Sequence, residues 1–228
     1  MWVAVDVPFR YAHWVAEVGQ LRHLISMELL QSTKSYFKFY KRLGKKGHHL
    51  IVKDLKELTP DVTKVLGEVR ASEVISPPDP EFEFMKQAAR LKIGVIGVPQ
   101  GRNQEEFFRL LESMYMSRFV TVIGLSKDAM GLLWDAPDVK VQDEMKLLLS
   151  RLYVLRYMLA QDLTAKPVHI LGLVNPEVEL PFFRGISEYS PLHIRSVSTS
   201  YPFTGADLSP AQLRRVLGTL LHLVETYT

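Results

Sequence analysis

Short apolar runs recur along the chain, and each ends at a glycine, proline or polar residue that leads into an amphipathic stretch. A continuous apolar run followed by a helical pattern is typical of a strand buried in a parallel sheet. The carboxyl ends of parallel strands meet on one face, where ligands bind, so the residues after each run are the first candidates for chemistry. The clearest runs are Ile93–Gln100, Phe119–Lys127, Val168–Asn175 and Ile194–Phe203.

The full pattern predicts eight strands, separated by amphipathic segments that fill most of the intervals. This alternation predicts an α/β fold, a closed (β/α)8 TIM-like barrel formed as a single domain by residues 1–228. An open doubly wound sheet is the alternative. The predicted strands are Trp2–Asp6, His23–Glu28, His49–Asp54, Glu73–Ser76, Lys92–Val98, Phe119–Leu125, Val168–Val174 and His193–Val197.

Local signals indicate where helices begin. Thr59 before Pro60 is typical of an N-cap followed by proline in the first turn, and Asn103 with Glu106 three residues later resembles a capping box. The longest irregular stretch, Asp128–Lys140, is a candidate lid. Helices are predicted over Tyr11–Arg22, from Pro60 to Arg70, from Pro80 to about Leu91, from Asn103 to about Met116, over Val141–Gln161 and from Pro210 onward.

Composition narrows the functional classes. The 228 residues are 47% hydrophobic and 23% charged, enough to bury a sizeable core, and the absence of cysteine excludes disulfides, thiolate zinc sites and cysteine nucleophiles. No apolar run reaches the roughly 18 residues of a membrane span. The first residues carry no basic leader, so we expect a cytoplasmic protein without a membrane partner. The seven histidines show no metal-ligand spacing and no nucleotide motif is present, so neither metal nor cofactor is expected.

Polar residues follow several predicted strands. The carboxylates Asp6, Glu28, Asp54 and Asp79 all fall at or near strand ends, where converging carboxylates serve acid–base catalysis, nucleophilic attack or metal binding. Each could instead cap the following helix, and for Asp79, before Pro80, capping is as good an interpretation. Candidate substrate-binding groups at the ends of the later strands are Gln100, Gly101, Gly124, Ser126 and Ser198.

Charge is unevenly distributed. No Asp or Glu occurs between Leu29 and Lys53, a window that carries +7, although the net charge of the chain is only +3. Lysine and arginine neutralise phosphates, and the interleaved aromatic residues could stack on unpaired bases. A solvated basic helix face is the plain alternative, with Phe37, Tyr40 and Leu43 or Gly44 as its core side. The candidate nucleic-acid-binding residues are Lys34, Lys38, Lys41, Arg42, Lys45 and Lys46.

Several segments resemble the tRNA-guanine transglycosylases, and most of all their short bacterial and phage relatives, the DNA 7-deazaguanine transglycosylases. Ile93–Gly101 is similar to the family strand that ends in Val-Gln-Gly, Val122–Ser126 to the next strand, and His169–Glu177 to a Leu-Met-Gly-Val-Gly-x-Pro-Glu segment. Ile194–Pro202 resembles the last strand, and Asp79 falls where a base-recognising Asp is expected. The resemblance implies a (β/α)8 barrel that acts on a purine base, with Gln100 in base binding.

The sequence also departs from this family. The nucleophilic Asp of the last strand is replaced by about Ser198, only Asp54 can stand in for the Asp of the Asp-Ser-Gly segment, and the cysteine zinc segment is absent. The resemblance implies an enzyme that acts on the N-glycosidic bond of a flipped-out base of nucleic acid, modified or not and in DNA ahead of RNA, either as a glycosylase or as a base transglycosylase. The departures favour hydrolysis, which would place the enzyme in the hydrolase class. Asp54 or Asp6 would activate water, and Asp79 would recognise the base.

Two alternatives stay open at this point. One is a nucleic-acid-binding barrel that has lost catalysis. The other is a small-molecule barrel enzyme whose basic surface is incidental. The sequence does not decide between a monomer and a homodimer.

Overall fold

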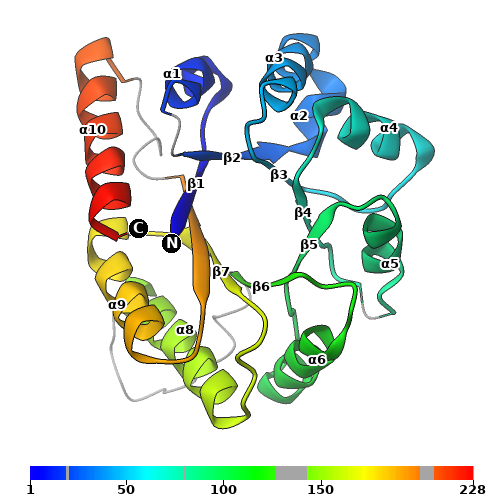
Figure 1. The fold of residues 1–228 in the computed structure, drawn as a ribbon, viewed down its shortest axis with the longest axis vertical. Helices are drawn as coiled ribbons and strands as arrows, with labels where there is room; N and C mark the ends of the chain where they lie inside the picture. Colours follow the sequence, from blue (N-terminus) through cyan, green and yellow to red (C-terminus); the bar gives the residue numbers. More distant parts are fainter. Residues whose placement is uncertain (19–20, 80, 127–142, 201–207, 228) are drawn as a thin grey trace.

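A computed structural model describes residues 1–18, 21–79, 81–126, 143–200 and 208–227. Within them the strands form a closed parallel barrel in chain order, with β8 paired to β1 (Figure 1). This confirms the predicted (β/α)8 barrel and excludes the open sheet. The strands are β1 (Trp2–Asp6), β2 (Arg22–Ser26), β3 (Leu50–Lys53), β4 (Glu73–Ile75), β5 (Gly94–Gly97), β6 (Val122–Ser126), β7 (Val168–Leu173) and β8 (Ile194–Thr199).

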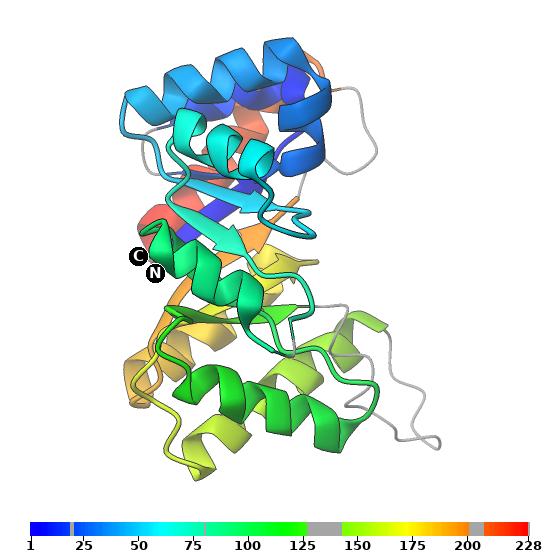
Figure 2. The same cartoon turned by 90° about the vertical axis from the view of Figure 1, so that its right-hand side faces the viewer.

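Helices surround the barrel on its outside (Figures 1 and 2). They are the 3-10 helix η1 (Phe9–Tyr11) and the α-helices α1 (Ala12–Ala16), α2 (Met27–Ser32), α3 (Lys34–Lys45), α4 (Pro60–Val69), α5 (Glu83–Arg90), α6 (Gln104–Met116), α8 (Asp143–Ala160), α9 (Pro176–Tyr189) and α10 (Pro210–Tyr227). None of the described helices is long and apolar enough to cross a membrane.

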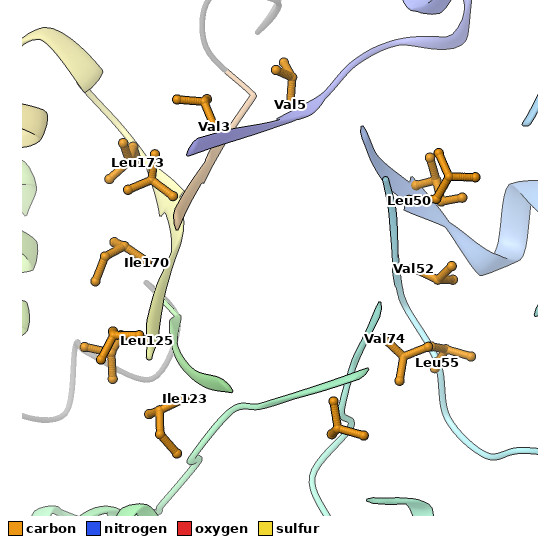
Figure 3. Close-up of a cluster of buried hydrophobic side chains, with 14 of the residues drawn as sticks. Val3, Val5, Leu50, Val52, Leu55, Val74, Ile123, Leu125, Ile170 and Leu173 are labelled. Carbon is orange, nitrogen blue, oxygen red and sulfur yellow. The ribbon is translucent and has the colours of Figure 1, made fainter. Parts of the chain in front are cut away.

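Alternation along the strands divides the apolar residues into two sets. The larger set points outward and packs against the helices, as Val3, Val52, Ile123 and Ile170 do in Figure 3. The smaller set fills the barrel interior. It consists of Ala4, Leu24, Ile51, Ile96, Val98, Val122 and Leu171, with Trp2 and Ile75 packed against it. Because these side chains fill the interior, no channel runs through the barrel. A ligand then has its place at the mouth formed by the carboxyl ends of the strands.

The opposite end of the barrel is closed by a polar floor, formed by Arg22, His49, Glu73, His169 and Arg195. Arg195 donates two hydrogen bonds to Glu73, at 2.7 and 2.9 Å, and His49 Nε2 lies 3.0 Å from the same carboxylate. Burial raises the pKa of Glu73, but the hydrogen bonds with His49 and Arg195 outweigh it and lower the pKa to about 2. The floor therefore holds a buried carboxylate in its charged form, paired across the barrel.

Helix starts follow the predicted signals. Thr59 Oγ1 accepts a hydrogen bond from the Val62 N–H, and Asn103 Oδ1 accepts one from the Glu106 N–H at 2.9 Å. The predicted helix over Tyr11–Arg22 is wrong in extent, because η1 and α1 end at Ala16 and Arg22 begins β2. Predicted strand His23–Glu28 ends early as well, since Glu28 lies in α2. Pro80 and the candidate lid Asp128–Lys140 lie outside the described residues.

Candidate active site

A cavity of about 370 Å³ opens at the carboxyl ends of the strands. It draws residues from almost every part of the barrel, which is the arrangement that brings distant side chains onto one ligand. Predicted residues Asp6, Asp54, Gln100, Ser126 and Ser198 all lie in its wall. The complete lining is Asp6, Leu24, Lys53, Asp54, Ile75, Val98, Gln100, Ser126, Leu171, Gly172, Ser198, Thr199 and Ser200.

An ion pair between β1 and β3 stands in this wall. Lys53 Nζ donates to Asp6 Oδ2 at 2.6 Å, and both side chains are about one-third exposed, at 28% and 36%. The charge-assisted bond fixes where the remaining N–H groups of the lysine point. A cation held in place beside a cavity can stabilise negative charge that develops on a bound molecule.

Sequence reasoning missed Lys53, although the signal was present. Ile51 faces the barrel interior, and side chains two apart on a strand share a face, so Lys53 also points inward. Simple alternation would turn the next residue, Asp54, outward. Asp54 reaches the cavity wall because its backbone adopts φ = 61°, in the left-handed region that side chains other than glycine rarely occupy.

Asp54 also borders two neighbouring hollows, of about 450 and 830 Å³, so it stands where the central cavity meets the groove above β2 and β3. No hydrogen bond or ion pair joins its carboxylate to another described residue. Arg70, Phe82, Lys92 and Asp162 share this backbone conformation outside the cavity, so it is the place of Asp54 in the cavity wall that makes it the first candidate for a group that exchanges a proton with a ligand.

The β7–β8 side of the cavity is held by a buried network. Gly172 has φ = 70°, and its N–H donates to Ser198 Oγ at 3.2 Å. Arg151 of α8, fully buried, donates to the carbonyl oxygens of Leu171 and Gly172 at 2.8 and 2.9 Å and pairs with Glu179. With the Ser198 oxygen already accepting one hydrogen bond, its own O–H can be donated elsewhere. No sequence motif marks Arg151.

The two predicted glycines have packing roles. A Cβ on Gly124 would come within 2.8 Å of Ile96, and one on Gly101 would come within 2.3 Å of the Phe107 nitrogen. Neither residue is in the cavity wall. Gly124 allows the barrel interior to close, and Gly101 allows the loop after β5 to lie against α6.

Asp79 is placed apart from the other predicted carboxylates. Its two carboxylate oxygens accept from the N–H groups of Glu83 and Met85, at 3.0 and 3.1 Å, so the residue caps the first turn of α5. It borders a separate hollow of about 200 Å³ with Pro77 and Pro78, and it does not line the central cavity. The structure thus favours the capping interpretation of Asp79.

Five of the six predicted basic residues lie on α3, outside the barrel, and Lys46 follows as the cap residue at its end (Figure 2). The buried side of this helix is Tyr36, Tyr40, Leu43 and Gly44, so the expected core position Phe37 is replaced by Tyr36. The aromatic residues expected to stack on bases are buried or partly buried against the core. Lys41 pairs with Glu68 of α4, and the other five cations are exposed.

No group of three or more histidine and acidic side chains among the described residues is arranged to hold a metal ion. The polar side chains in the wall of the central cavity are one lysine, two aspartates, an amide and several hydroxyls.

Comparison with known proteins adds the fold class. No protein-family model and no curated protein matches the chain. Among solved structures, thiamine phosphate pyrophosphorylase from Pyrococcus furiosus is 16% identical, with a TM-score of 0.58 over 99% of this chain and 96% of that one. The 3-keto-L-gulonate-6-phosphate decarboxylase from Vibrio cholerae is 13% identical, with a TM-score of 0.55 over 100% and 98%.

Phosphoribosyl anthranilate isomerase from Thermotoga maritima is 14% identical, with a TM-score of 0.55 over 97% of this chain and 100% of that chain. At such low identity these likenesses carry the architecture and not the chemistry. They agree with the strand order in placing the chain among the (β/α)8 barrels, a fold that these enzymes share.

Proposed function

We propose that the protein is an enzyme that acts on a small polar molecule bound in the mouth of the barrel. The observation that carries this proposal is the Lys53–Asp6 pair in the wall of the central cavity, with Asp54 beside it. A cavity of about 370 Å³ falls at the small end of the range for metabolite sites. Of the hypotheses from the sequence, this one corresponds to the small-molecule barrel enzyme.

The reaction type that these groups suit best is removal of a proton next to a carbonyl. Asp54, without a partner among the described residues, would accept the proton from carbon. The electron pair would move onto the carbonyl oxygen, and the Lys53 ammonium would stabilise the resulting enolate. Asp6 would hold the Lys53 side chain in position through their ion pair. An enolate is formed by loss of a proton in keto–aldo isomerisation, by loss of CO₂ in β-keto acid decarboxylation and by carbon–carbon cleavage in a retro-aldol reaction. The scheme therefore leaves open which of these reactions the enolate belongs to.

The substrate class follows from the opposite wall. Ser198, Thr199 and Ser200 with Gly172 offer hydroxyl and backbone groups at the ends of β7 and β8, a region where barrel enzymes frequently bind phosphate. The names of three solved structures that share this fold refer to phosphorylated compounds. We therefore propose a phosphorylated or polyhydroxylated carbonyl compound as substrate.

Proton exchange with solvent tests this function without knowledge of the final product. The protein is incubated in D₂O with a panel of phosphorylated ketoses and 2-keto acids, and NMR records deuterium incorporation next to the carbonyl. We expect at least one compound to exchange, and Lys53→Met and Asp54→Asn to slow that exchange at least about 100-fold. Lys64→Met, on exposed α4, is the matched control and keeps the wild-type rate. Absence of exchange across the panel, or full exchange by Lys53→Met, would contradict the proposal.

The N-glycosidic hypothesis remains a second candidate because Asp6, Asp54 and Gln100 do share one cavity. Its base-recognising Asp79 lies elsewhere, as a helix cap. Incubation with duplex DNA containing modified purines distinguishes the two. Release of free base, dependent on Asp54 and leaving an abasic site, would favour the glycosylase; exchange of carbonyl protons with no base release favours the small-molecule enzyme.

A further inference from the structure

We propose that the outer surface of α3 docks the phosphate backbone of double-helical nucleic acid, independently of the reaction in the barrel mouth. This surface, the α3 basic face, consists of Lys34, Lys38, Lys41, Arg42, Lys45 and Lys46. It runs along the outside of the barrel, where Figure 2 shows α3 as the outermost helix at one end of the molecule.

The charge on this face is largely uncompensated. Only Lys41 has an ion pair, with Glu68, among the contacts of the described residues; no such pair reaches Lys34, Lys38 or Arg42. The hydrogen bond from Lys41 lowers the pKa of Glu68, and the nearby Lys64 and Lys45 act in the same direction. Glu68 is thus one carboxylate within a cationic surface that extends from α3 onto α4.

The helix dipole favours only part of this arrangement, because Arg42 and Lys45 lie in the last turn of α3. Lys34 lies in the first turn of α3, where the helix dipole disfavours a cation, and that turn holds no acidic residue. Lys34, Lys38 and Arg42 follow one another at four-residue spacing, where like charges repel. The helix dipole therefore accounts for the cations at the end of α3 but not for the stripe that starts at Lys34, whereas an anionic partner would offset the repulsion along the whole stripe.

The helix beneath the charges is rigidly seated. Gly44 lies so close to α4 that a Cβ there would be 1.9 Å from the Val69 carbonyl oxygen. Tyr36 and Tyr40 are buried, with ring centroids 4.6 Å apart, and the Tyr36 hydroxyl accepts from the Ser26 N–H. The cations therefore stand on a fixed platform, and binding needs no ordering of the backbone.

The packing of α3 against the barrel also indicates which kind of anionic partner fits its exposed face. A membrane-binding helix inserts its apolar side into the lipid, but the apolar side of α3 is buried against the barrel. Single-stranded binding depends on aromatic platforms, and the α3 aromatics are covered or partly covered. What remains exposed is a row of cations about 6 Å apart along the helix, suited to contacts with phosphates alone. The chemistry is the dense phosphate array of a duplex, read without regard to sequence.

Fluorescence anisotropy tests this with the full-length protein and labelled duplexes of about 20 base pairs, DNA and RNA, in about 50–200 mM KCl. With four phosphates neutralised we expect a log–log salt slope near −4. Changing Lys34, Lys38, Arg42 and Lys45 together to Gln should weaken binding in low salt more than about 10-fold and flatten the slope. The same variant should melt no lower than the wild type, because it relieves repulsion within α3.

A matched variant separates this surface from net charge. Changing Arg90, Arg109, Arg118 and Arg156, all exposed on other parts of the barrel, to Gln removes the same four charges. It should keep the wild-type affinity within about twofold and the same slope. The proposal is wrong if both variants lose binding equally, if single strands bind more tightly than duplexes, or if anionic vesicles bind and duplexes do not. Both fourfold variants should keep the wild-type rate of proton exchange. Failure of the nucleic-acid proposal is therefore distinguishable from failure of the proposed enzymatic function.

Discussion

At the scale of single residues, two imidazoles are held neutral by burial. His23 packs against the rings of Tyr40 and His48, and burial, with a smaller effect of His48, lowers its pKa to about 4. His169 is fully buried; burial, followed by the Arg195 charge, lowers its pKa to about 3. Its Nδ1 lies 2.6 Å from Ser196 Oγ. In the unfolded chain both would titrate near their ordinary pKa of about 6.5.

These histidines predict acid lability. Because the folded pKa values lie below the unfolded ones, the folded state binds fewer protons, and stability is complete above about pH 7 and lost as the pH falls from about 6.5 toward 4. His23→Phe should remove on the order of 2 kcal/mol of the loss in unfolding free energy between pH 7 and pH 4.5. Urea unfolding at the two pH values measures it, with exposed His13→Gln as the control. An unchanged pH dependence in His23→Phe would show that His23 binds its proton as readily in the folded state as in the unfolded chain.

At the scale of elements, Asp79 gives a direct test of capping against base recognition. Its carboxylate accepts two N–H groups of α5, so Asp79→Ala should lower the unfolding free energy by about 1 kcal/mol and leave catalysis in the barrel mouth unchanged. Asp61→Ala, at an exposed position in the first turn of α4, is the comparison. Thermal melting and the proton-exchange assay measure the two effects. Loss of proton-exchange activity in Asp79→Ala with an unchanged melting temperature would contradict the capping role and show that Asp79 acts in the functional site.

The elements also show what the sequence could predict. The predicted strand ends lie within three residues of the observed ones, because buried parallel strands are continuous apolar runs. The bounds of β1 coincide with the prediction. Capping residues such as Thr59 and Asn103 are local signals and were confirmed. The helix over Tyr11–Arg22 was overextended, because amphipathic spacing alone does not mark where a chain must turn back into the next strand.

The candidate site was predictable only in part, because a local sequence pattern shows which residues follow strands but not which distant side chains meet. Asp6, Asp54 and Gln100 were found because they follow strands. The pairing of Lys53 with Asp6 joins residues 47 positions apart, and Arg151 reaches Leu171 of β7 from α8, 20 positions away, so neither contact leaves a local pattern. The left-handed conformation of Asp54 is likewise imposed by its surroundings, since nothing in the Lys-Asp-Leu sequence requires it.

At the scale of the whole molecule, the Glu73–Arg195 pair ties β4 to β8, which lie on opposite sides of the ring. Glu73→Gln should lower the unfolding free energy by about 3–5 kcal/mol, because it leaves the partly buried Arg195 without its counter-charge. Glu73→Leu combined with Arg195→Met should cost less than Glu73→Gln alone. Denaturant unfolding measures the three variants. A double variant less stable than Glu73→Gln would mean that the pair itself, and not the uncompensated charge, carries the stability.

Closure of the ring by β1 and β8 has a consequence for synthesis on the ribosome. The edge of β1 that pairs with residues Ser196–Thr199 has no partner until those residues, about 190 positions later, have been made. At about 5–20 residues per second, this open edge persists for roughly 10–40 s. Unpaired apolar strand edges invite pairing with other chains, so the nascent protein depends on shielding by chaperones or by its own early helices. The closed ring leaves no unpaired strand edge in the folded barrel. Because the last strand must pair with the first, the same ring keeps the edge of β1 unpaired for most of synthesis.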